Sequence, residues 1–154
     1  MINGFVQRGG WWVVGQFLLL LAIAGLDLAG HAAVKPLPIF IGGLVLIMAA
    51  TVCCLAGLLA LGRNLTPFPK PTARTELVQH GIYRLMRHPL YTSVFCAAVG
   101  SSLIFHSWPA VVASAVLGVF FDAKARHEEH WLRQQFPDYG NYELRVRRFI
   151  PWVY

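Results

Sequence analysis

The stretch Gly81–Tyr91, GIYRLMRHPLY, decides how the rest of the chain is interpreted. It lies between a polar, proline-rich segment over 62–80 and an apolar run that begins at Pro89. Because proline suits the first turn of a helix, Pro89 predicts a helix start with His88 just outside it. The polar groups gathered here are phenols, guanidinium groups and an imidazole, from Tyr83, Tyr91, Arg84, Arg87 and His88. Such polar density where an apolar helix begins predicts a functional site at a membrane surface.

The composition is that of a membrane protein. Of 154 residues, 56% are hydrophobic and only 13% are charged, a more apolar balance than soluble domains of this size have. Met1–Gly10 holds one arginine, and no small-residue cleavage site precedes a polar segment, so we expect no cleavable signal peptide. We predict a single domain over 1–154, with two spans in 1–61.

Four apolar runs predict an all-α integral membrane bundle of about four transmembrane helices. The first two, Trp11–Ala29 and Leu37–Leu61, are long enough to cross a hydrocarbon core of roughly 30 Å. The third is Pro89–Phe105 and the fourth is Trp108–Phe121. The fourth run is too short to span alone, so we expect its helix to continue through Asp122–Phe136 as a cytosolic C-terminal extension.

The basic residues predict the orientation of this bundle. With four spans, twelve of the 13 lysines and arginines fall on one side and Lys35 falls alone on the other. Because basic loops stay in the cytosol, both termini are expected to be cytosolic in a multi-pass protein of the inner membrane. The twelve are Arg8, Arg63, Lys70, Arg74, Arg84, Arg87, Lys124, Arg126, Arg133, Arg145, Arg147 and Arg148. This basic face is pressed on the membrane, so we expect lipid contacts and no nucleic-acid partner.

The cysteines, Asp27 and the prolines of 62–80 are expected to have structural roles. Cys53, Cys54 and Cys96 lie in apolar runs without CxxC spacing and are expected to pack as small residues. Asp27, near the end of the first span, is expected to reach headgroups or water. The three prolines of 62–80 favour an extended path there.

A metal site or a soluble nucleotide-binding scaffold is not supported. His127 and His130 have the spacing of two ligands, but no third ligand is evident and HExxH is absent, so no metal is expected. GxGxxG, P-loop and GxSxG motifs are also absent.

Two polar clusters are expected to be neighbours. One is Tyr83–Tyr91 and the other is Lys124–Glu129, and an apolar helical hairpin separates them in sequence. A hairpin of antiparallel helices returns the chain to where it began, so both clusters should lie at the cytosolic surface. Lys124 and Glu128 are four residues apart and share a helix face. A salt-bridged, solvated helix end is the alternative interpretation of the second cluster.

Three motifs follow one another from Leu77 to Pro151. A Gly-x-Tyr-x-x-x-Arg-His-Pro-x-Tyr run comes first, then Glu-Glu-x-x-Leu after a helix pair, then an aromatic-rich end. Their residues are Gly81, Tyr83, Arg87, His88, Pro89 and Tyr91; Glu128, Glu129 and Leu132; and Phe136, Tyr139, Tyr142 and Arg147–Pro151. In this order they make the chain similar to the isoprenylcysteine carboxyl methyltransferase family, which also includes phospholipid N-methyltransferases. The first two spans carry no part of the resemblance.

The resemblance implies an integral membrane methyltransferase that uses S-adenosylmethionine and takes a lipophilic acceptor from the bilayer. It implies that 62–154 form the cofactor-binding catalytic region. The cofactor contacts it implies fall on Leu77, Val78, Tyr83, His88, Pro89, Leu90, Tyr91, Lys124 and Glu128. Two positions depart from the family pattern: Lys124 stands where relatives often have arginine, and Pro137 where they often have glycine. Arg126 is the alternative to Lys124 as a cofactor contact.

The residue chemistry agrees with this implication. Glu128 can pair with the ammonium of the cofactor, and His88 with the helix start at Pro89 can hold its carboxylate. Tyr83 and Tyr91 can flank the adenosine or the sulfonium.

The acceptor side is assigned to Arg87 and Glu129. A carboxylate acceptor, most simply of the isoprenylcysteine type, needs no base, and Arg87 would orient it. An amine acceptor, as in phospholipid N-methylation, would need a base such as Glu129 or His127. The remaining alternatives are an NADPH-dependent membrane reductase and a non-catalytic lipid-binding protein.

Overall fold

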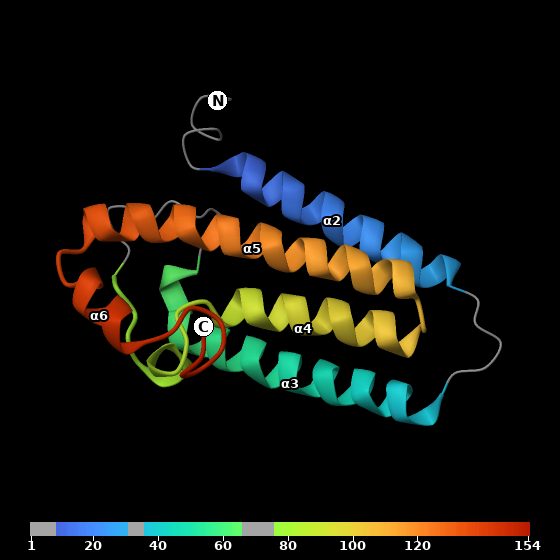
Figure 1. Ribbon diagram of the computed structural model, residues 1–154. Helices are drawn as coiled ribbons and strands as arrows, with labels where there is room; N and C mark the ends of the chain where they lie inside the picture. The colour runs from blue at the N-terminus through green and yellow to red at the C-terminus, as the bar shows by residue number, and fades with distance from the viewer. Residues whose placement is uncertain (1–8, 31–35, 66–75) are drawn as a thin grey trace.

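Four long helices lie side by side in the computed structural model, which describes residues 9–30, 36–65 and 76–154. They are α2 (Gly10–Ala29), α3 (Leu37–Leu61), α4 (Pro89–Ile104) and α5 (Trp108–Gln135). Across the bundle their order is α2, α5, α4, α3, because α4 packs on both α3 and α5 while α2 packs chiefly on α5 (Figure 1). The predicted all-α bundle and its apolar helices are confirmed.

The helices differ in whether they are long enough to cross a membrane. α2, α3 and α5 are long and apolar enough, whereas α4 has only 16 residues. At 1.5 Å per residue α4 is about 24 Å long, somewhat short of a hydrocarbon core of roughly 30 Å. The number of four spans therefore stays a prediction. The loop prolines of the sequence prediction and Lys35 lie outside the described residues.

Glycines allow α3 and α4 to approach closely. A Cβ added at Gly43 would lie 2.7 Å from the carbonyl oxygen of Gly100, and one added at Gly100 would lie 2.9 Å from that of Gly43. Nearer the other end of α3, a Cβ at Gly57 would lie 2.9 Å from Leu90. Close backbone contact through small residues is a common way for membrane helices to associate. It holds the start of α4 against the end of α3.

Asp27 does not reach water as expected. Its side chain is buried, with 4% of the residue exposed, and Oδ2 accepts a hydrogen bond of 2.8 Å from Ser101 of α4. A buried carboxylate requires such a polar partner. The hydroxyl of Ser101 thus draws Asp27 into the bundle.

The C-terminal part of the chain forms structure that the sequence did not predict. A short helix α6 (Tyr139–Arg145) follows α5. The chain then runs beside 86–88, where the N–H groups of Arg87 and His88 donate to the carbonyls of Arg147 and Arg148. The 3₁₀ turns η1 (Gly62–Asn64) and η2 (Gly81–Arg84) complete this end of the bundle. All these segments surround the start of α4.

Candidate active site

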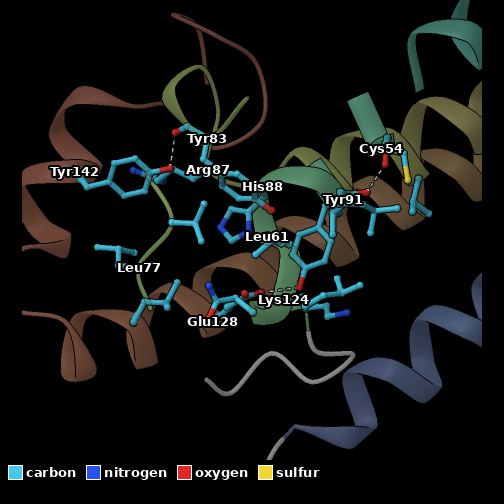
Figure 2. A pocket seen from close by; sticks show the side chains of 18 of the residues that line it. Cys54, Leu61, Leu77, Tyr83, Arg87, His88, Tyr91, Lys124, Glu128 and Tyr142 are labelled. Carbon is cyan, nitrogen blue, oxygen red and sulfur yellow. Dashed lines mark hydrogen bonds between the residues drawn. The ribbon is translucent and has the colours of Figure 1, made fainter. Parts of the chain in front are cut away.

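A cavity of about 390 Å³ opens where these segments meet (Figure 2). Its walls come from α2, the end of α3, η1 with Leu65, residues 76–78, η2, the start of α4, α5 and α6. The volume lies within the range of small-molecule and cofactor sites, roughly 300–1,000 Å³. Sequentially distant parts of the chain therefore enclose one site.

Most residues that the sequence assigned to a cofactor line this cavity. They are Leu77, Val78, Tyr83, His88, Leu90, Tyr91, Lys124 and Glu128. Pro89, the ninth, is instead buried at the first position of α4. Arg87 also lines the cavity, whereas Glu129 does not. The two polar clusters are neighbours, as predicted.

Glu128 faces the cavity with a carboxylate that forms no ion pair with any described residue. The Tyr91 hydroxyl donates to its Oε2 over 2.6 Å, and Figure 2 shows both side chains at the cavity wall. The ring of Tyr91 stacks between His88 and Phe121, with centroids 5.2 and 5.0 Å away. This packing fixes the ring. Tyr91 in turn orients Glu128 toward the cavity.

Lys124 is held in place by α2. Its Nζ donates to Oε1 of Gln16 over 2.6 Å and lies 4.9 Å from the centre of the Tyr91 ring. Arg126, the alternative to Lys124, points elsewhere: it bonds Asp122 and Tyr154 and does not line the cavity. Of the two cations, only Lys124 is placed to contact a ligand there.

Glu129 is surrounded by two arginines and a histidine. It is 0% exposed and lies 3.0 Å from Arg87, 3.1 Å from His88 and 2.7 Å from Arg148. Buried charges need such partners, and breaking a buried pair destabilises a protein strongly. The carboxylate thereby joins the start of α4, helix α5 and the C-terminal segment. It supports the cavity wall from behind.

Arg87 connects the cavity to α6. Its Nη1 donates to the carbonyls of Glu143 and Val146 over 3.0 and 3.1 Å. Glu143 is in turn paired with Arg133, whose hydrogen bonds lower the pKa of the Glu143 carboxyl. Of the three guanidinium nitrogens of Arg87, Nε alone is buried without a hydrogen-bond partner among the described residues. Protein groups therefore hold most of the guanidinium in place.

Several cavity residues received no role from the sequence. Tyr139 and Tyr142 reach the cavity from α6, and Gln16 from α2. The Tyr142 hydroxyl donates to the carbonyl of Tyr83 over 2.6 Å, while that of Tyr139 has no partner among the described residues. A lone glutamine in an apolar run was a usable signal for Gln16. His127 lies apart from the cavity lining, against Trp12 and Trp131.

The buried phenols of this region stay neutral. Burial raises the pKa of Tyr83, Tyr139 and Tyr142 well above that of an ordinary tyrosine. Neutral aromatic rings attract a cation through their faces without forming an ion pair. With the unpaired carboxylate of Glu128, they make a site suited to a cationic, partly aromatic ligand.

Most of the chain is similar to proteins of a known family. The family model described as phospholipid methyltransferase matches residues 38–139. The chain belongs to this family. The match runs from the start of α3 to the start of α6 and includes most of the cavity residues. The resemblance inferred from the sequence motifs is thus confirmed, and the chain is an integral multi-pass membrane protein.

Individual relatives of the chain include methyltransferases and metal-resistance proteins. A probable protein-S-isoprenylcysteine O-methyltransferase of Oryza sativa subsp. indica is 32% identical over 115 residues, covering 72% of this chain and 60% of the relative. Protein-S-isoprenylcysteine O-methyltransferase A of Arabidopsis thaliana is 33% identical, with 72% and 58% covered. The nickel-cobalt-cadmium resistance protein NccN of Alcaligenes xylosoxydans xylosoxydans is 28% identical, with 97% and 68% covered. The chain thus spans about 60% of the length of the first two relatives.

A solved structure has the same fold. The eukaryotic intramembrane Ras methyltransferase ICMT superposes with a TM-score of 0.69 at 21% identity, covering 98% of this chain and 53% of that one. The region shared includes α2, which lies outside the family model.

Proposed function

We propose that the chain transfers a methyl group from S-adenosylmethionine to a lipophilic acceptor in the membrane. The observation that carries the proposal is the cavity, whose wall presents the unpaired Glu128 carboxylate between neutral aromatic rings. Family membership supports the same reaction, as do the names of the relatives from rice and Arabidopsis. The single catalytic domain over 1–154 is part of this proposal.

The residues of the cavity fit the cofactor. S-adenosylmethionine supplies a methyl group on a sulfonium, and it also carries an ammonium and a carboxylate. Glu128 binds the ammonium, and Tyr83 and Tyr91 lie against the cationic and aromatic parts. His88 and the N–H groups of the first turn of α4 hold the carboxylate, helped by the helix dipole. Leu77, Val78 and Leu90 supply apolar contacts, and Pro89 fixes the helix start.

The acceptor in this proposal is a carboxylate of the isoprenylcysteine type. Alignment does most of the work in methyl transfer, and a carboxylate needs no base. This suits Glu129, whose oxygens already bind arginines and a histidine, so we assign it a positioning role. Arg87 holds α6 at the cavity and keeps a positive charge near the acceptor carboxylate. An amine of a phospholipid is the second candidate, favoured by the description of the family model.

We also propose that both termini face the cytosol in the inner membrane, as the basic residues indicate. The cavity would then open toward cytosolic S-adenosylmethionine, while the acceptor would enter from the bilayer. Membrane lipids would surround the exposed apolar faces of α2 and α3.

A transfer assay tests the reaction. The purified protein in lipid nanodiscs is incubated with methyl-tritiated S-adenosylmethionine and either N-acetyl-S-farnesylcysteine or phosphatidylethanolamine. We expect base-labile label, a methyl ester, on the farnesylcysteine, and much less of it with the Glu128→Gln variant at a cofactor concentration that half-saturates the wild type. Base-stable label on phosphatidylethanolamine would support the second candidate instead. Label on neither acceptor would contradict both acceptor assignments.

A further inference from the structure

A second cavity, of about 210 Å³, lies outside the candidate active site. Its lining is Arg84, Leu85, Leu144, Arg145, Arg147 and Trp152. The residues come from η2, from the end of α6 and from the C-terminal segment. No acidic side chain is among those that line it. The cavity therefore concentrates positive charge from three parts of the chain.

These arginines differ from four of the five others in the described part of the chain; the fifth, Arg63, is exposed on η1 and forms no ion pair with a described residue. Arg87, Arg126, Arg133 and Arg148 all pair with carboxylates. Arg84 and Arg147 have no ion pair or side-chain hydrogen bond with a described residue, and Arg145 bonds only the carbonyl of Asn141 in its own helix. Guanidinium groups without carboxylate partners are ready to bind an anion, and their planar fork suits a phosphate.

The rim of this cavity is apolar and exposed. Leu144 and Trp152 are each 83% exposed, and Leu85 is 46% exposed. Trp152 has φ 63, a left-handed conformation that is unusual for a residue other than glycine and costs conformational energy. Within the turn at 150–153, its ring is exposed. Tryptophan beside arginine at the start of a membrane helix is typical of the headgroup region.

The backbone places this cavity at the level where α4 begins. Met86 pairs with Arg147, and the N–H of Arg87 donates to the Arg147 carbonyl over 2.9 Å. Pro89, the first residue of the apolar helix α4, follows directly. The C-terminus lies beside the start of α4 in Figure 1. An apolar rim and unpaired arginines thus meet where headgroups would lie.

We propose that this cavity binds the phosphate headgroup of an anionic phospholipid. Arg84, Arg145 and Arg147 contact the phosphate, while Trp152 and the leucines lie against the glycerol and the upper acyl chains. The charge of the site selects an anionic lipid over a zwitterionic one, because choline would place a second cation among the guanidinium groups. The proposal is independent of methyl transfer, since it concerns a different cavity.

Native mass spectrometry of the detergent-purified protein tests it. The protein is titrated with phosphatidylglycerol or with phosphatidylcholine of the same acyl chains. We expect the first phosphatidylglycerol to bind about tenfold more tightly than phosphatidylcholine. Arg84→Gln should weaken phosphatidylglycerol binding by about fivefold, the factor that corresponds to ~1 kcal/mol for one arginine near a lipid surface.

Arg63→Gln is the matched control. Arg63 is an exposed arginine of η1 that does not line the cavity, so its replacement removes the same charge elsewhere. We expect this variant to keep the affinity for phosphatidylglycerol. Equal losses in the two variants, or equal binding of the two lipids by the wild type, would overturn the proposal. Displacement of phosphatidylglycerol by equimolar inorganic phosphate would also overturn it, because the site would then bind a soluble anion.

Discussion

Consecutive glutamates in α5 have opposite environments. Glu128 faces the candidate active site, and among the described residues only the Tyr91 phenol bonds its carboxylate, whereas Glu129 is fully buried among Arg87, His88 and Arg148. The helical turn of about 100° per residue separates the two side chains, so one faces the cavity and the other the packed interior. In the proposed function, the Glu-Glu pair of the family motif thus combines ligand binding by Glu128 with support of the site by Glu129.

Glu128→Gln should weaken S-adenosylmethionine binding while leaving the fold intact. The neutral amide loses a charge-assisted contact worth roughly 1.5–3 kcal/mol, or about one to two decades of affinity. Equilibrium binding of tritiated cofactor to the purified variant measures the change. Asp138→Asn, an exposed carboxylate outside the cavity lining, is the control and should bind as the wild type does. Wild-type affinity in Glu128→Gln would rule out the ammonium contact.

Glu129→Gln should instead destabilise the protein. Removing a buried charge leaves Arg87 and Arg148 inadequately paired, at a cost of about 3–5 kcal/mol. The midpoint of thermal unfolding in detergent should fall clearly. Glu143→Gln serves as the comparison, since Glu143 pairs with Arg133 at a half-exposed position and such a pair contributes about 0–1 kcal/mol. Similar midpoints for the two variants would contradict the supporting role of Glu129.

At the level of elements, the contact between α3 and α4 holds the site together. α3 carries Leu58 and Leu61 of the cavity wall, and α4 begins with the residues that carry the motif. Glycines let the two backbones touch far from the cavity, and Gly57 does the same beside it. The geometry of the site therefore depends on small residues that never contact a ligand.

Gly43→Ala tests that dependence. Its new Cβ would meet backbone atoms of α4, so the helices must separate, and overpacking of this kind typically costs about 1–3 kcal/mol. We expect a lower thermal midpoint in detergent. Gly42→Ala is a matched control because nothing lies within 4 Å of its Cβ. Equal thermal midpoints for the two variants would contradict the close contact between α3 and α4.

The sequence predicted the long helices well and the C-terminal elements poorly. α3 begins at Leu37 and ends at Leu61, as predicted, because proline precedes it and glycine follows it. α6 was missed because its seven residues, YGNYELR, have no apolar periodicity. Tertiary contacts hold it instead, through Arg87 and the Tyr142 hydroxyl. The sequence also did not predict which face of α3 packs on α4. α3 is apolar on every face, and nothing in the sequence distinguishes Gly43, which contacts α4, from Gly42, which does not.

For the whole molecule, both cavities and most of the basic residues are assigned to the same end of the helical bundle. The candidate active site, the second cavity and the ion pairs of Arg87 and Arg148 all lie around the start of α4. Twelve of the 13 basic residues belong to that side in a four-span arrangement. The far end contributes the Asp27–Ser101 contact to packing.

Cysteine labelling tests this arrangement. A cysteine introduced at Lys35 should react with a membrane-impermeant maleimide added to intact cells, and one at Arg145 should react only after the cells are opened. The prediction rests on the retention of basic segments in the cytosol. Cys53, Cys54 and Cys96 lie within α3 and α4, so the wild type serves as the unlabelled background. Reaction of both positions from the same side would exclude four spans.

Direct titration of the purified wild-type protein with S-adenosylmethionine, beside NADPH, tests the central claim most directly. Isothermal calorimetry in detergent should give saturable binding of S-adenosylmethionine near one molecule per chain and no heat with NADPH. The thermal midpoint should rise with S-adenosylmethionine alone, because a ligand that binds only the native state stabilises it. Saturable binding of NADPH without binding of S-adenosylmethionine, or binding of neither, would contradict a methyltransferase site in this cavity.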